Sequence, residues 1–266
     1  MMLQRQGRGL WMALGLALVA GGPAGCASMG EGSDVGQIER STGKNRQAAE
    51  VNTELASGYM REGELKVAME KVKRAIAFDG SYAAAHHVHA LLLDRLGEEE
   101  EAGEAYRKAH RFDRDNPGIA NNYAGYLCRV GEYERAQALF RSAYEDPLYE
   151  TREYALVNSG RCYQRAGESE KALEQFRRAI DSGSNQPVAV LGMARALHEQ
   201  GESEEAARVM ERYESRFRHT PESLATAIEI DKAVGDDAAL ANHRLILRGR
   251  FPDSPEAKEQ QAGGSQ

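Results

Sequence analysis

Three histidines close together, at positions 86, 87 and 89, are the side chains that first suggest metal chemistry in this chain. His86 and His89 are three residues apart, so a helix would place both imidazoles on one face. No nearby carboxylate or cysteine on the same helix completes a set of ligands, and these positions fit a face buried between helices. We therefore expect no metal ion and no cofactor at this cluster.

No arrangement of catalytic side chains is recognisable elsewhere in the sequence. It contains no nucleophile paired with a base, no paired carboxylates in helical register and no glycine-rich phosphate loop. The net charge of -7 argues against nucleic-acid binding, which needs clustered positive charge. We expect no enzyme, no catalytic residues, no small-molecule substrate and no nucleic-acid partner, so function should lie in a surface that binds proteins.

A glycine recurs at one position of a repeating unit, with spacings of 34, 34, 36, 34 and 34 residues. The six glycines are Gly63, Gly97, Gly131, Gly167, Gly201 and Gly235. A 34-residue unit of two short helices joined by a tight turn is the tetratricopeptide architecture, in which stacked units share their core. The period predicts an all-α, superhelical tetratricopeptide-repeat solenoid of six helix-turn-helix repeats over residues 47–257.

Other residue classes recur in phase with the glycines. Alanine lies five residues after the glycine in the first five units, and a bulky apolar residue lies nine residues after it. These columns contain Ala68, Ala102, Ala136, Ala172 and Ala206, and Val72, Tyr106, Phe140, Phe176 and Met210. Their helical spacing indicates a core in which small side chains let the two helices of a unit approach. The last two units are degenerate, because Tyr213 and Leu247 replace a further column of alanines.

The first 26 residues predict export and lipidation. Arg5 and Arg8 precede an apolar run of about 11 residues, which is too short to span a bilayer but suits a signal peptide. The small residues before Cys26 resemble the bacterial lipobox, which implies a lipoprotein signal peptide over residues 1–25 and acylation of Cys26. Ala27, in place of aspartate, then implies sorting to the outer membrane. The alternative is an ordinary secretory signal cut nearby.

The segments on either side of the repeats have no apolar periodicity. Residues 26–46 are rich in glycine, serine and charge, and we expect a flexible tether there. Residues 258–266 end in a small, polar stretch, and we expect a disordered tail.

Cys128 and Cys162 fall late in the first helices of consecutive units, which are neighbours along the inner face of such a solenoid. An exported protein permits a disulfide between them. The alternative is a pair of buried small apolar side chains, as free cysteines often are. The spacing by itself leaves both open.

Positions 2, 5, 9, 12 and 13 of each first helix line the concave groove of this architecture. Arginine recurs there, at Arg61, Arg95, Arg129, Arg161, Arg165 and Arg195. These side chains could bind carboxylates of an extended partner segment, or could simply be favourable charges near helix C-termini. The candidate partner-binding residues are Met60, Leu91, Asn121, Arg129, Val157, Arg161, Arg165 and Arg195.

The third and fourth units contain distinctive runs at residues 121–128, 131–133, 146–149 and 158–163, and the two-residue insertion behind the spacing of 36 falls in the Asp-Pro-Leu-Tyr loop. In these runs and in the place of the insertion, the chain resembles the PilF/PilW family of type IV pilus biogenesis and stability proteins. The resemblance implies an outer-membrane lipoprotein on the periplasmic face, a pilotin that binds the pilus secretin and promotes its localisation and multimerisation. It also implies the Cys128–Cys162 disulfide, which some members carry.

Two other functions fit the same architecture. One is an outer-membrane scaffold lipoprotein for cell-envelope assembly enzymes. The other is a cytoplasmic chaperone adaptor, which would require the first 26 residues to remain uncleaved and without lipid.

Overall fold

The computed structural model describes residues 33–263, with side chains over residues 43–261, and it is helical throughout with no strand in that stretch. The chain divides into two units, residues 1–42 and 43–266. The first contributes the start of helix α1, and the second contains the repeats. The predicted signal peptide and Cys26 lie outside the described residues. No helix within the described range has the length and apolar character to cross a bilayer.

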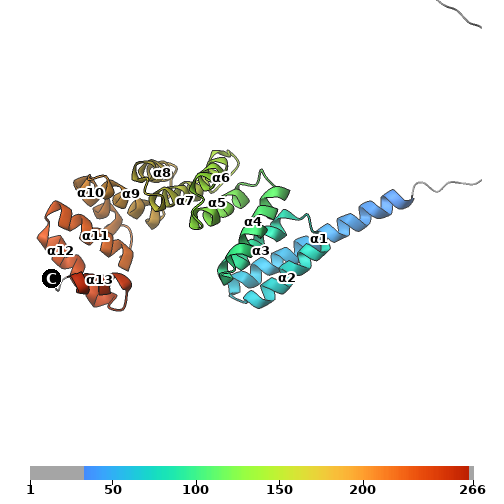
Figure 1. Cartoon of the computed structure of the whole chain (residues 1–266), viewed down its shortest axis with the longest axis horizontal. Coiled ribbons are helices and arrows are strands. Elements are labelled where there is room, and N and C mark those ends of the chain that lie inside the picture. The colour runs from blue at the N-terminus through green and yellow to red at the C-terminus, as the bar shows by residue number, and fades with distance from the viewer. Residues whose placement is uncertain (1–32, 264–266) are drawn as a thin grey trace, which may run out of the picture. The chain divides into compact units, whose positions relative to one another are not determined.

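The all-α fold with six helix-turn-helix repeats is confirmed (Figure 1). The hairpins are α1 (Ser33–Glu62) with α2 (Leu65–Phe78), α3 (Ala83–Leu96) with α4 (Glu99–Phe112), α5 (Pro117–Arg129) with α6 (Tyr133–Glu145), α7 (Arg152–Arg165) with α8 (Ser169–Asp181), α9 (Pro187–Glu199) with α10 (Ser203–Glu214), and α11 (Pro221–Val234) with α12 (Asp237–Arg250); α13 (Pro255–Gly263) follows. From unit three onward the first helices of adjacent units, α5, α7, α9 and α11, also pack against one another.

The recurring glycine ends the first helix of every unit in a left-handed conformation. All six glycines have φ between 76 and 86°, a region that other residues enter at a cost. In the second unit, the backbone N–H of Glu98 donates to the carbonyl oxygen of Leu93 at 3.0 Å, and the same bond recurs in the other five. The glycines are therefore turn residues, as the sequence predicted.

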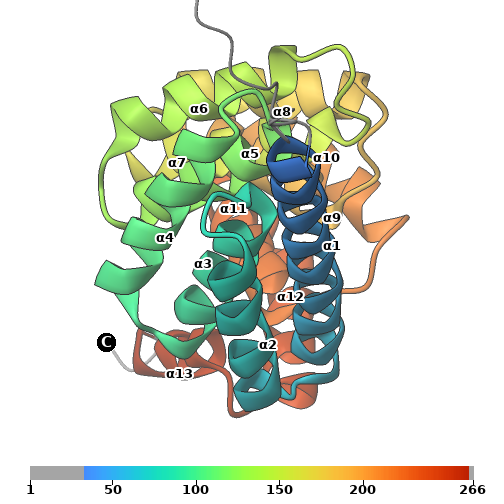
Figure 2. The same cartoon turned by 90° about the vertical axis from the view of Figure 1, so that its right-hand side faces the viewer.

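The columns of small and bulky residues form the core. Ala68, Ala102, Ala136, Ala172 and Ala206 are fully buried, and Val72, Tyr106, Phe140, Phe176 and Met210 are at most 3% exposed. One cluster of buried side chains runs from α3 to α11, so each unit completes the core of its neighbour. In Figure 2, α2 lies beside α3 and α3 lies beside α4, as consecutive helices of a tetratricopeptide array do.

The expected tether is shorter than the sequence suggested. It was predicted over residues 26–46, but α1 begins at Ser33, and the glycines within its first turns do not break it. From Arg46 onward, contacts with the rest of unit one hold the helix. The Arg46 guanidinium pairs with Asp79 at 2.9 Å and lies over the ring of Tyr82, and Ala49 is fully buried. Residues 26–32 lie outside the described range.

The disordered tail predicted over residues 258–266 is also wrong in part, because α13 extends to Gly263. The hydroxyl of Ser254 accepts a hydrogen bond from the N–H of Ala257 at 3.1 Å and so caps this helix. Ala257 is fully buried with Leu224 and Leu247. Gln260 also donates to a carboxylate oxygen of Glu229 at 3.4 Å. One buried alanine produces no apolar periodicity, which explains why the sequence did not indicate this helix.

Candidate partner-binding groove

A hollow of about 340 Å³ lies between the first helices α3, α5 and α7, and we call it the central groove. Its lining comprises Leu91, Asp94, Tyr106, Asn121, Asn122, Gly125, Cys128, Arg129, Phe140, Asn158, Arg161, Cys162 and Arg165. A second hollow of about 310 Å³ continues along α7, α9 and α11, and it shares Arg161 and Arg165 with the first. These two arginines therefore lie where the hollows meet.

Three of the recurring arginines are engaged with a neighbouring unit. Arg95 donates to the backbone carbonyl oxygen of Met60 at 2.8 Å, and Arg129 forms an ion pair with Asp94. Arg195 pairs with Glu222 at 3.0 Å. Arg195 also donates to the hydroxyl of Thr226 at 3.2 Å. Because each of these guanidinium groups already has an acceptor inside the protein, these three arginines join repeats, and a partner would have to compete for them.

Arg161 and Arg165 differ from the other arginines of the groove. Both side chains are exposed, and neither has a hydrogen-bond or ion-pair partner among the described residues. They are four residues apart on α7, so they project from one face about one helical turn apart. Two unpaired guanidinium groups at this spacing can each bind a carboxylate of an extended chain through paired hydrogen bonds.

Amide side chains form the floor of the central groove. Asn158 donates to the side-chain oxygen of Asn121 at 3.1 Å, across the boundary between units three and four. Asn122 donates to Nε2 of His87 at 2.9 Å, across the boundary between units two and three. Burial lowers the pKa of His87 to about 4, so its neutral ring can accept this bond. Asn122 and Asn158 were missed in the sequence, although both occupy position 6 of their units.

Cys128 and Cys162 form a disulfide that joins α5 to α7, with their Cα atoms 5.8 Å apart. Both cysteines line the central groove. The bond therefore fixes the separation of the two helices that carry Asn121, Arg129 and the two unpaired arginines.

The structure brings together most, but not all, of the residues predicted to bind a partner. Leu91, Asn121, Arg129, Arg161 and Arg165 line the central groove, and Arg195 lines the adjacent hollow. Met60 lies outside both and packs beside the core of unit one.

The prediction for Val157 is wrong, because its side chain is only 2% exposed. It belongs to the core, since α7 packs against α5, α6, α8 and α9 and this position faces those helices.

His86 is a core residue, as its helical position indicated. Its side chain is 6% exposed, and its ring donates from Nε2 to the carbonyl oxygen of Gly80 at 2.9 Å. The ring also stacks on Phe112, with centroids 5.4 Å apart. This nitrogen is therefore occupied by the backbone.

Comparisons with known proteins agree with this architecture. Family models described as tetratricopeptide repeat match residues 83–116, 126–187 and 157–221. The type IV pilus assembly protein PilF of Pseudomonas aeruginosa is 29% identical over 246 residues, which cover 92% of this chain and 96% of that protein. The structure of that organism's PilF superposes with a TM-score of 0.73, at 29% identity, and covers 83% of this chain and 99% of its own. PilW, a type IV pilus biogenesis factor, superposes with a TM-score of 0.76 at 28% identity, over 81% of this chain and 99% of its own.

Proposed function

This chain is a PilF/PilW-like tetratricopeptide repeat protein that belongs to type IV pilus biogenesis, and we propose that within this process it is the pilotin, an outer-membrane lipoprotein that binds the pilus secretin. The similarity to PilF and PilW extends along nearly the whole of both chains, which supports carrying over the process to which they belong. In this proposal the chain promotes the localisation of the secretin to the outer membrane and its multimerisation.

The pair Arg161 and Arg165 is the observation that carries the binding proposal. Arg129 and Arg195 form ion pairs with carboxylates of the solenoid itself. Arg161 and Arg165 are exposed and have no such partner among the described residues, and they lie where the two hollows meet. An extended secretin segment with acidic side chains fits this pattern, because it can run from one hollow to the next and place a carboxylate on each guanidinium.

Apolar and amide groups beside the arginines would supply the remaining contacts. Leu91 lines the central groove and Val188 the second hollow, and both are partly exposed. The amides of Asn122 and Asn158 can hydrogen-bond the backbone of an extended chain, as polar groups in recognition grooves do. Charges would fix the register of the segment, and apolar contacts would add affinity.

Lipidation of Cys26 would determine where this complex acts. Two or more acyl chains anchor a protein stably to a bilayer, whereas one gives marginal binding. The anchor would hold the repeats at the periplasmic face of the outer membrane, where a bound secretin subunit inserts. Cys26 precedes the described residues, so this step rests on the lipobox in the sequence.

The test measures the fraction of secretin that runs as heat-stable multimer in outer-membrane fractions. A strain without this chain should lack the multimers, and the intact chain should restore them. The double variant R161Q/R165Q and the variant Cys26→Ala should each restore less than about a tenth. The matched control is R208Q, because among the described residues Arg208 pairs only with Glu205 of its own helix α10, and it lies outside both hollows.

Unchanged multimers in the deletion strain would overturn the pilotin proposal and favour the envelope-scaffold function. Full restoration by R161Q/R165Q, with both proteins at equal abundance, would instead exclude the arginine pair as the binding site.

A further inference from the structure

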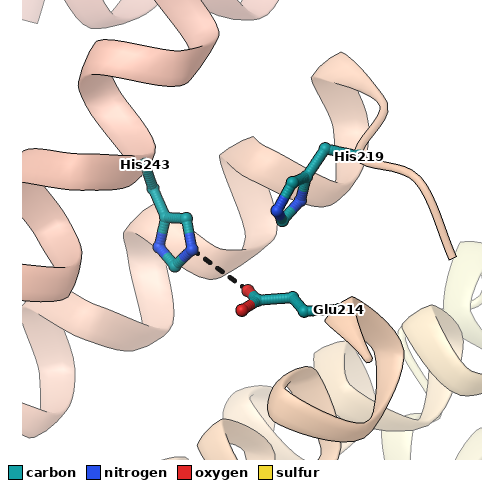
Figure 3. Close-up of side chains that lie close together, drawn as sticks. All are labelled: Glu214, His219 and His243. Atoms are coloured by element: carbon teal, nitrogen blue, oxygen red, sulfur yellow. Dashed lines mark ion pairs between the residues drawn. The ribbon is translucent and has the colours of Figure 1, made fainter. Parts of the chain in front are cut away.

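Three ligand-bearing side chains meet where the last two repeats join, far along the chain from the central groove (Figure 3). Glu214 is the last residue of α10, His219 lies in the connection between α10 and α11, and His243 comes from α12. One ligand atom of each lies within 4.8 Å of the others. This cluster cannot be recognised in the sequence, because its members are five and 24 residues apart and show no motif.

His243 is held in place through both of its ring nitrogens. Its side chain is buried, and Nε2 lies 3.0 Å from a carboxylate oxygen of Glu214. Nδ1 lies 2.7 Å from a carboxylate oxygen of Asp231, which is itself buried on α11. A histidine whose second nitrogen contacts a carboxylate is the usual arrangement of a metal ligand in proteins, since the carboxylate fixes the orientation of the ring.

His219 supplies an independent observation. Its Nδ1 atom is buried and has no hydrogen-bond partner among the described residues. Its ring lies edge-on to that of His243, with centroids 5.7 Å apart. Burying a polar atom without a partner costs free energy, and a metal ion bound at this nitrogen would remove that cost.

We propose that Glu214, His219 and His243 bind a divalent transition-metal ion of the zinc class. Two imidazoles and one carboxylate are a known ligand set for Zn²⁺, with a water in the fourth position. Bonds of about 2.0–2.2 Å in a tetrahedron separate the ligand atoms by about 3.4 Å. His243 and Glu214 are already at 3.0 Å, and His219 needs to approach by no more than about 1.4 Å.

The proposed ion would join α10, α12 and the connection before α11. These elements belong to units five and six, in which Tyr213 and Leu247 replace the alanine column of the earlier units. A ligand that binds only the folded state stabilises it in proportion to its concentration. The metal would thus fasten the degenerate end of the solenoid. The Glu214 side chain is 32% exposed and offers a route of entry.

The competing explanation is a charged cluster with no metal. The hydrogen bonds to Glu214 and Asp231 raise the pKa of His243 to about 9, so that its imidazolium can donate to both carboxylates. In that case His219 is not needed. The two explanations therefore differ in what the removal of His219 does.

The experiment titrates ZnCl2 into the full chain after treatment with EDTA, at pH 7, and follows heat and melting temperature. We expect one Zn²⁺ per chain and a higher Tm with Zn²⁺ but not with Mg²⁺. H219Q should bind Zn²⁺ at least about 100-fold more weakly. It should keep the fold, because it leaves the bonds of His243 to Glu214 and Asp231 in place.

H89Q is the matched control, since His89 lies on α3 and belongs to no such cluster in the described part of the chain. It should bind Zn²⁺ with the same affinity as the parent. When Co²⁺ replaces Zn²⁺, the parent and H89Q should both show the strong visible absorption of tetrahedral coordination. Absence of Zn²⁺ binding, or equal affinity in H219Q, would overturn the metal site. Neither result bears on the secretin multimers, so the two proposals fail separately.

Discussion

Cys128 and Cys162, in the first helices of units three and four, are joined by a disulfide in the wall of the central groove, with Cα atoms 5.8 Å apart. The bond has a sequence separation of 34 residues and joins the first helix of one unit to the first helix of the next. It holds α5 and α7 at a fixed separation, so the groove that presents Arg161 and Arg165 is covalently braced.

We predict that replacing both cysteines by alanine lowers the free energy of unfolding by about 3–4 kcal/mol. The disulfide closes a loop with a sequence separation of 34 residues and so restricts the unfolded chain. Urea denaturation measures the change. A reductant should lower the midpoint of the parent protein and leave that of the double variant where it is. Equal stability of parent and variant would contradict the prediction.

A methyl group at Gly192 should destabilise the protein by about 1–3 kcal/mol. In α9, a Cβ at this position would overlap the ring of Phe176, which also lies 2.8 Å from where a Cβ at Gly160 would be. Gly125→Ala is the control, because that helical site has no neighbouring atom within 4 Å. Alanine there should stabilise by about 0.5–1 kcal/mol through helix propensity. Thermal unfolding of the two variants and of the parent checks both predictions. A G192A variant as stable as the parent would contradict the first one, because it would show that the ring of Phe176 can move at little cost in free energy.

Acid should weaken unit two through its histidines. Burial lowers the pKa of His87 to about 4, whereas in the unfolded chain it is about 6.5. Between these values the unfolded state binds more protons, so the free energy of unfolding falls as pH decreases from about 6.5 to 4. His87 should account for about 2–3 kcal/mol of that loss.

Urea denaturation at pH 7, 5.5 and 4 checks this on the parent and on H87Q, in which glutamine can still accept from Asn122. The variant should lose less stability on acidification. Burial also lowers the pKa of His89 to about 4, so a residual slope should remain in H87Q. Parallel curves for parent and H87Q would exclude His87 as a source of the acid sensitivity.

Repetition made most of the fold predictable. The six glycines locate six turns, since a residue with φ near 80° after a helix is almost always glycine, and the alanine columns locate the close approach within each hairpin. Once the period was known, the order and pairing of the helices followed from the stacking of tetratricopeptide units.

The repeat pattern did not predict the structural features that depend on packing at single positions. Helix α13 packs through the buried side chain of Ala257. Helix α1 begins at Ser33, before the first repeat, where the repeat pattern makes no prediction. The position of Val157 in its unit predicts a place in the groove. In the structure this side chain is buried in the core, because it faces the helices that pack against α7. The cluster of Glu214, His219 and His243 depends on how the connection before α11 folds back, which no spacing in the sequence reports.

The arginine contacts between units have a consequence for how the array can evolve. Arg95 bonds backward to Met60, Arg129 backward to Asp94, and Arg195 forward to Glu222. Each of these three boundaries thus has its own donor and acceptor, although the turn glycine is the same in every unit. Duplicating, deleting or exchanging a unit would keep the apolar stacking and leave mismatched polar groups at the new junction. At these three boundaries the order of the repeats is therefore favoured by contacts that the repeat pattern itself does not contain.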